Sequence, residues 1–173
     1  MKGTILKCME QLVTEHFGQD KWAQALDQAG IPASRRRFTL LSDVNETDAR
    51  AIMQAAAAVT SMSMSQFMDA FGEYWSTVFA PHVYAAYYSN VRSARELLLN
   101  LDHIHEVMTK SVKFAKPPRF VYEWQGDKHL IMRYRSGRDM IGLMPGLIRG
   151  VGKYYNEKLY VRVTGDAVHI EFP

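Results

Sequence analysis

The sequence predicts an α+β protein in which a helical N-terminal part is followed by a small antiparallel sheet with one helix packed on it. In the first two-thirds of the chain, apolar residues recur every three or four positions, which is typical of amphipathic helices. Pro117 and Pro118 stop a helix, and after them the apolar period falls to two, which indicates strands. Because no repeat or linker divides the sequence, we expect a single domain over residues 1–173.

The helical part divides at capping residues, glycines and prolines. The predicted helices cover residues 5–17, 20–30, 45–59, 63–80 and 83–88, and a last one begins near residue 93. Their expected caps are Asp20, Asn45 and two capping boxes, Ser63 with Gln66 and Ser93 with Glu96. Pro81 is expected to break or kink the fourth helix, since proline lacks the backbone N–H that a helix interior needs.

Two hairpins are predicted in the last third of the chain. The first joins strands over residues 120–125 and 129–136 through a turn at Gly126-Asp127. The second joins residues 159–163 and 168–172 through a turn at Gly165-Asp166. Between them we expect a helix from Asp139 to about Tyr155, which Pro145 bends or delays.

The composition is that of an ordinary globular protein. Apolar residues make up 47% of the 173 residues and charged residues 23%, and no apolar run approaches the roughly 20 residues needed to cross a bilayer. No signal peptide is recognisable at the start, so we expect a cytoplasmic protein. The net charge of +3 is too small to indicate nucleic-acid binding, although Arg35, Arg36 and Arg37 form a basic run. Cys8 is the only cysteine, which excludes a disulfide framework and a cysteine-rich zinc site.

His105 is the histidine that the helical pattern points inward. It shares one face of the helix from Ser93 with Leu101 and Met108, at steps of three and four residues. His103 lies about 200° around the same helix and is expected to face water beside Asp102 and Glu106. A single histidine on an apolar face is most often a core residue with one hydrogen bond, and that interpretation stays open here.

A short extended segment carries three hydrogen-bond donors. Tyr134, Ser136 and Arg138 alternate along it, so their side chains are predicted to point to one side. A phenol, a hydroxyl and a guanidinium together bind carboxylates or phosphates. With an inward imidazole, such a group suits heme, whose iron needs an axial ligand and whose propionates need donors. Two other classes stay open: an enzyme acting on an anionic substrate, and a binding module for an apolar acid that does not use His105.

These residues resemble the heme–nitric oxide/oxygen binding (H-NOX) family, which includes the sensor domain of soluble guanylate cyclase. The resemblance covers nearly the whole chain and is specific because its motifs occur together. They are Met1-Lys2-Gly3-Thr4-Ile5, Leu101-Asp102-His103-Ile104-His105, Pro117-Pro118-Arg119, Tyr134-x-Ser136-x-Arg138 and Gly146-Leu147-Ile148-Arg149-Gly150.

The resemblance implies a heme b cofactor with His105 as the axial ligand of ferrous iron. Tyr134, Ser136 and Arg138, which we call the clamp residues, would hold the propionates, and Pro118 would press on the porphyrin and distort it. Leu101 and Met108 would line the heme on the helix of the axial histidine. The apolar wall on the other side would consist of Ile5, Met9, Leu143, Met144 and Leu147; we call these five residues the distal wall.

The resemblance also implies a gas sensor and not an enzyme. Oxygen-binding relatives carry a tyrosine five residues after the clamp arginine, where this chain has Leu143, so we expect a nitric oxide sensor that also takes carbon monoxide and excludes oxygen. An oxygen-binding protein that uses Tyr74 as donor is the alternative. Strain or rupture of the iron–His105 bond would signal to a partner, either a sensor histidine kinase or a cyclic-di-GMP enzyme.

Overall fold

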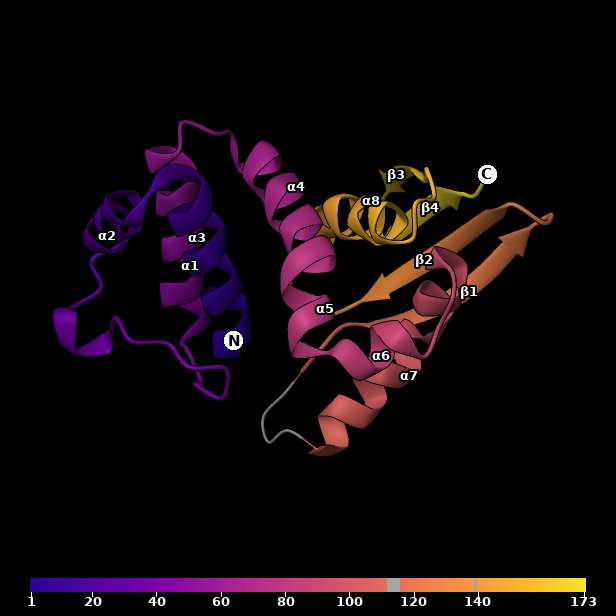
Figure 1. Ribbon diagram of the computed structural model, residues 1–173, viewed down its shortest axis with the longest axis horizontal. Coiled ribbons are helices and arrows are strands. Elements are labelled where there is room, and N and C mark those ends of the chain that lie inside the picture. The colour runs from indigo at the N-terminus through magenta and orange to yellow at the C-terminus, as the bar shows by residue number, and fades with distance from the viewer. Residues whose placement is uncertain (112–115, 139) are drawn as a thin grey trace. The chain divides into compact units, whose positions relative to one another are not determined.

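The computed structural model describes residues 1–111, 116–138 and 140–173 (Figure 1). Contacts cluster into two compact units, residues 1–71 and 72–173. The expectation of a single domain over residues 1–173 therefore stays a prediction. In the part of the chain that is described, no helix is both long and apolar enough to cross a membrane.

The first unit is helical, as predicted. Its elements are α1 (Gly3–Phe17), α2 (Gln19–Gln28), a 3-10 turn (Ala33–Arg35), α3 (Glu46–Val59) and most of α4 (Met64–Tyr74). The largest side chains buried within it include Leu6, Met9, Trp22, Ile52 and Phe67. These residues recur at helical spacing along α1 to α4, which confirms the periodicity of the sequence.

Two of the predicted caps in this unit are confirmed and one is wrong. The Asn45 side chain accepts a hydrogen bond from the Thr47 N–H (2.8 Å), which starts α3. Ser63 and Gln66 form the reciprocal capping box at 2.9 and 3.2 Å. Asp20 is not a cap, because α2 starts one residue earlier and places Asp20 in its first turn, where a carboxylate still favours the helix dipole.

The second unit holds the remaining helices and the sheet. Its helices are a π-helical turn (Trp75–Phe79), α5 (Ala80–Val83), α6 (Ala85–Ser89), α7 (Ala94–Ser111), a 3-10 turn (Ile141–Leu143) and α8 (Met144–Tyr154). Its strands are β1 (Arg119–Gln125), β2 (His129–Arg135), β3 (Tyr160–Thr164) and β4 (Ala167–Glu171).

Pro81 does not break the fourth helix where the sequence predicted. Helical backbone runs from α4 through the π-helical turn into α5, and Pro81 lies in the first turn of α5. A proline is tolerated there because the missing N–H falls where the hydrogen-bonding pattern changes from the π-helical to the α-helical spacing. The direction of the chain changes three residues later, at Tyr84.

The sheet is antiparallel throughout, with strand order β1-β2-β4-β3. Both predicted turns are confirmed, since Gly126 and Gly165 adopt φ angles of 71° and 60°, which glycine reaches without strain. At six of the eight strand ends the observed bound differs from the predicted one by a single residue, and the other two ends agree.

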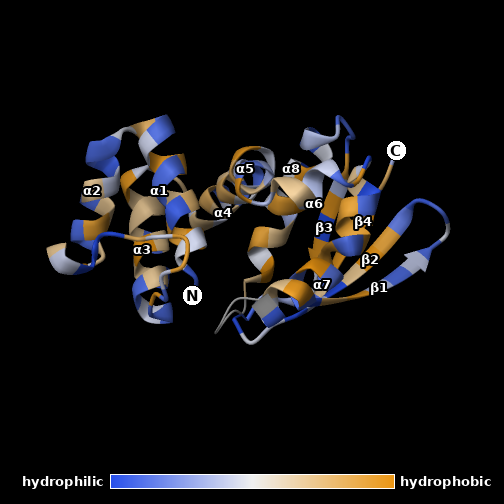
Figure 2. Ribbon diagram, turned by 60° about the horizontal axis from the view of Figure 1, so that its bottom comes forward, coloured by the Kyte–Doolittle hydropathy of each residue, from blue (hydrophilic) through white to orange (hydrophobic). Residues whose placement is uncertain are grey.

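One face of this sheet is covered by α7 and α8. The core-facing strand residues are Leu130, Met132, Val168 and Ile170, which alternate along β2 and β4. They pack with Leu97, Leu98 and Ile104 of α7 and with Met144, Ile148 and Val151 of α8. Figure 2 shows the apolar residues of these elements in orange. The sheet with its covering helices confirms the predicted α+β class.

The start of α7 shows a cap that the sequence did not predict. The Ser93 hydroxyl accepts from the Glu96 N–H (3.1 Å), as a capping box requires, but the Glu96 carboxylate bonds the Arg92 N–H instead of that of Ser93. The N–H of Ala94 donates to the Glu157 carboxylate (3.0 Å), 63 residues away. The segment after α8 therefore caps the helix that carries His105.

The helix expected from residue 139 begins later. Residue 139 lies outside the described residues, the 3-10 turn Ile141–Leu143 follows it, and α8 starts at Met144 with Pro145 in its first turn. Proline at that place lacks an N–H that the first turn does not use, so the predicted delay of this helix is confirmed.

Candidate functional site

His105 lies on α7 with its ring turned toward the start of β1. Its Nδ1 lies 2.8 Å from the Pro118 carbonyl oxygen, and the Phe120 ring is 5.7 Å from the imidazole, centre to centre. A carbonyl oxygen only accepts, so Nδ1 carries the proton and Nε2 keeps its lone pair. Metal-bound histidines commonly have this arrangement, in which the second nitrogen donates to a backbone carbonyl.

The environment of His105 favours the neutral form. Burial lowers the pKa of the imidazole, and the Pro118 carbonyl and the Asp102 carboxylate oppose this effect more weakly. A neutral imidazole is the form that binds a metal ion. The exposed ring of His103, two residues earlier, faces solvent as predicted.

Asp102 joins α7 to β1, a role that the sequence interpretation missed. Its carboxylate accepts two hydrogen bonds from Arg119 (2.8 and 2.7 Å) and one from the Phe120 N–H (2.7 Å). The Tyr122 hydroxyl lies 3.2 Å from the Asp102 N–H and donates to the Leu98 carbonyl (2.8 Å). We call these residues the Asp102 cluster; they hold the His105 helix against the strand that Pro118 precedes.

The Asp102 cluster shifts the pKa values of its members. The Arg119 guanidinium and the Phe120 N–H lower the pKa of Asp102 to about 2. Burial raises the pKa of Tyr122 to about 12, so its hydroxyl stays a donor at neutral pH. The Asp-His spacing on one helix was the only local signal for this cluster, because Arg119 and Tyr122 come from a strand about twenty residues further on.

We predict that the Asp102 cluster makes the stability of the protein depend on acidity. A carboxyl with a lowered pKa stabilises the folded state above the unfolded-state pKa of about 3.9, and this stabilisation is lost as the pH falls from about 4 to 2. Urea unfolding between pH 2 and 7 should show a steeper acid loss for the wild type than for Asp102→Asn. The exposed Asp127→Asn variant is the control, and parallel pH profiles for wild type and Asp102→Asn would contradict the prediction.

The three clamp residues do not follow one strand. Tyr134 lies in β2, which ends at Arg135, and Ser136 follows it, whereas Arg138 lies in a turn. The expectation that the three alternate along one extended segment is therefore wrong at Arg138. The reason is local: the Ser136 hydroxyl accepts from the Arg138 N–H (3.2 Å) and closes a turn at Gly137.

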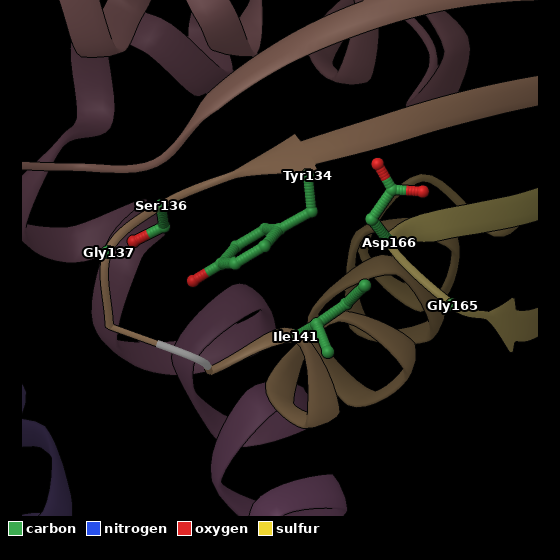
Figure 3. A pocket seen from close by; sticks show the side chains of 6 residues that line it. All are labelled: Tyr134, Ser136, Gly137, Ile141, Gly165 and Asp166. Atoms are coloured by element: carbon green, nitrogen blue, oxygen red, sulfur yellow. The ribbon is translucent and has the colours of Figure 1, made fainter.

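Tyr134 and Ser136 line an open cavity of about 330 Å³ (Figure 3). Gly137, Ile141, Gly165 and Asp166 complete its lining. Figure 3 shows the Tyr134 ring extending from β2 with its hydroxyl turned to the same region as Ser136, and with Ile141 on the opposite side of the ring. Asp166 brings a carboxylate to the rim, where Arg133 lies 3.7 Å away and offsets its charge.

Arg138 reaches the same backbone segment as His105. Its Nη1 donates to the Lys116 carbonyl (2.7 Å), two residues before the carbonyl that His105 contacts. The segment 116–119 thus receives the imidazole, the Arg138 guanidinium and the Asp102 carboxylate. A ligand with a metal ion and acidic groups suits such an arrangement of neutral nitrogen, hydroxyls and guanidinium.

The remaining predicted site residues divide between the two units. Leu101, Met108 and Leu147 are half-buried beside the core of the second unit, where Leu143 and Met144 are buried. In the first unit Met9 is fully buried and Ile5 half-buried. The grouping of the five distal wall residues around one ligand stays a prediction. The helical spacing of the sequence also predicts Val112 on the same face as His105, but this residue lies outside the described residues.

The pattern of the other titratable residues does not indicate a second metal site. Among residues 1–111, 116–138 and 140–173, no three His, Cys, Asp or Glu side chains gather as metal ligands. His129 and His169 contact each other at 3.1 Å across β2 and β4, on the face of the sheet opposite the helices.

The chain matches the model of the haem-NO-binding family over residues 2–163. It is 24% identical over 160 residues to the soluble guanylate cyclases gcy-32 and gcy-34 of Caenorhabditis elegans, which covers 88% of this chain and 23% of each relative. The chain thus spans about a quarter of the length of these curated relatives.

Solved structures share the fold. An H-NOX protein from S. oneidensis in the Fe(II)NO state superimposes with a TM-score of 0.89 at 19% identity, covering 100% of this chain and 99% of that chain. An oxygen-binding H-NOX domain related to soluble guanylate cyclases gives a TM-score of 0.83 at 25% identity, covering 99% and 95%.

The chain belongs to the haem-NO-binding, or H-NOX, family. Members of this family bind heme and sense gases such as nitric oxide and oxygen, and the domain is a sensor module without catalytic activity of its own. The fold class and the family resemblance read from the sequence are confirmed.

Proposed function

We propose that this chain is a sensor of nitric oxide that binds heme b through His105. The observation that carries the proposal is the 2.8 Å contact between His105 Nδ1 and the Pro118 carbonyl, which leaves the Nε2 lone pair available for the proposed bond to iron. Heme would supply a ferrous iron whose bond to the imidazole weakens when nitric oxide binds. The chain itself supplies the orientation of the imidazole, through Pro118 and the Asp102 cluster.

The acidic groups of the cofactor would meet the clamp residues. Tyr134 and Ser136 present hydroxyls toward one cavity, and Arg138 lies in the adjoining turn. Neutral donors and a guanidinium lower the cost of placing carboxylates near the protein interior. Pro118 would contact the porphyrin, since its carbonyl oxygen lies 2.8 Å from His105 Nδ1 and so keeps this proline beside the proposed ligand.

The proposed preference for nitric oxide rests on the apolar residues that precede and begin α8. Leu143 and Met144 are 6% and 3% exposed and carry no donor. Bound oxygen gains from a donor, and a hydrogen bond worth about 1–3 kcal/mol changes affinity by roughly 5- to 150-fold. Nitric oxide and carbon monoxide need such a donor much less. Tyr74 is buried and has a hydroxyl, so an oxygen sensor that uses Tyr74 is the second candidate.

Spectra of the purified protein test this proposal. The reduced protein should show a Soret band that shifts with nitric oxide and with carbon monoxide, and exposure to air should give no stable oxygen-dependent spectrum. A stable spectrum in air that is lost in Tyr74→Phe would favour the second candidate. A protein that takes up no heme would contradict both.

We predict that Leu143→Tyr creates oxygen binding. A phenol at this place would supply the donor that the apolar residues lack, and one such hydrogen bond supports a gain of about tenfold or more in oxygen affinity. Oxygen titration of the reduced variant checks the gain, with Leu143→Phe as the control of similar size. Equal affinities of the two variants would show that the shape of the pocket, and not a donor, decides.

The proposed signal passes from His105 to another protein. Release of His105 Nε2 would free α7 from the heme, while the Nδ1 contact with Pro118, the Asp102 cluster and the Glu157 cap would keep their partners. The helix would then shift relative to β2, the strand that carries Tyr134. The proposed partner is a sensor histidine kinase or a cyclic-di-GMP enzyme, and the proposed location is the cytoplasm. Co-purification of the chain with a candidate partner in the absence and presence of nitric oxide tests this step.

A further inference from the structure

Ser76 makes a buried hydrogen bond between two segments far apart in the sequence. Its side chain is 2% exposed, and its hydroxyl donates to the Leu147 carbonyl (2.9 Å), 71 residues away. Ser76 belongs to the π-helical turn Trp75–Phe79 and Leu147 to the first turns of α8. A carbonyl inside a helix already accepts an intrahelical hydrogen bond. The bond from Ser76 is therefore a second one to this carbonyl, and it joins the two segments.

Glycines bring the two segments unusually close together. A Cβ added to Gly150 would lie 2.8 Å from the Ser76 Cβ, and one added to Gly72 would lie 2.4 Å from the Leu147 nitrogen. Neither distance is tolerated by packed atoms, so both positions require glycine. At the exposed end of the contact, Lys153 pairs with Glu73 at 2.6 Å. Helix α8 therefore packs backbone to backbone on residues 72–79.

Close packing of smooth glycine surfaces fixes the distance between two helices, but it resists sliding along their axes only weakly. A directional hydrogen bond removes that freedom, because it holds one donor to one carbonyl.

We infer that Ser76 is a positioning residue that holds Leu147 of α8, and Leu143 directly before α8, in the place where the gas ligand meets them. This inference rests on the proposed function, since it assigns a purpose to the distal wall. Without the bond, α8 keeps its glycine contacts and gains freedom to shift along residues 72–79. Loss of the bond should therefore change the shape of the gas pocket more than the affinity for heme, because Ser76 is not among the contacts described for His105 and the clamp residues.

Two matched variants test the inference. Ser76→Ala removes the hydroxyl that bonds α8, and Thr77→Val removes the neighbouring hydroxyl, which donates to the Glu73 carbonyl one turn earlier along the same chain segment (2.8 Å). Two measurements are made: carbon monoxide association and the C–O stretching band in the reduced heme-loaded proteins, and amide hydrogen exchange of residues 147–151 in the heme-free proteins.

Ser76→Ala should bind as much heme as the wild type, change the carbon monoxide association rate by about 3- to 10-fold, and broaden or split the C–O band. Exchange of residues 147–151 should accelerate by a similar factor, while Thr77→Val matches the wild type in each measurement. Equal behaviour of the two variants, or loss of heme from Ser76→Ala alone, would overturn the inference. A wild-type protein that takes up no heme would instead contradict the proposed function, and the exchange comparison alone would then decide whether Ser76 holds α8.

Discussion

His105→Gly is expected to abolish stable heme binding, and added imidazole is expected to restore it. The contact of Nδ1 with Pro118 leaves the Nε2 lone pair of His105 as the proposed ligand, so the variant would remove the proposed axial ligand itself. Changes to groups that only orient a ligand already cost about 10- to 100-fold in metal affinity, and loss of the ligand should exceed that. The Soret absorbance of the variant, titrated with hemin and then with imidazole, measures both effects.

His103→Gly provides the matched control for His105→Gly. His103 lies on the same helix, two residues away, and is exposed, so both variants carry the same helix penalty of about 1 kcal/mol for glycine. Only His105→Gly should lose heme. If the two variants keep the same heme content and the same spectrum, His105 is a core histidine and the proposed ligand assignment is wrong.

Arg138→Ala is expected to weaken the retention of heme. Removing one partner of a buried charge pair costs about 2–5 kcal/mol. Arg138 is only half-buried, so the lower end of this range applies. It corresponds to a loss of heme that is roughly 30-fold faster than from the wild type. Transfer of heme to an excess of apomyoglobin measures the rate. The rate of heme loss from Arg138→Lys should lie between those of the wild type and Arg138→Ala, because lysine keeps the charge without the planar pair of donors.

The effect of Arg138→Ala must be separated from the loss of its bond to the Lys116 carbonyl. Arg135→Ala is the control for charge, since Arg135 is exposed at the end of β2. Urea unfolding of the heme-free variants reports the contribution of the Lys116 bond. Heme transfer rates that are equal for the two alanine variants would remove Arg138 from the clamp.

Local patterns were sufficient for most of the fold. Periodicity predicted the helices, three of the four predicted caps lie at the starts of their helices, and the change of period after Pro118 predicted the strands. The errors occurred where a helix began before the expected cap, as at Asp20, or where the helix changed type before a proline, as at Pro81. These alternatives differ by about 1 kcal/mol or less, which sequence reasoning does not resolve.

The candidate site was only partly accessible from the sequence. His105 was found because its place on an apolar stripe is a local property of one helix. The contact of its Nδ1 with Pro118, the Asp102 cluster and the turn at Arg138 were not found, because each joins residues whose meeting depends on the packing of α7 on β1 or on a local turn.

The sequence by itself determined the class of fold and the family, and it supplied His105 as the residue proposed to bind iron, because these depend on periods and motifs within short segments. The tertiary structure alone decided which nitrogen of His105 is available, how Asp102 holds its helix, and that Ser76 reaches Leu147. Those features depend on hydrogen bonds between residues 13 to 71 positions apart, and a bond of that kind leaves no periodic signal in either of the segments that it joins.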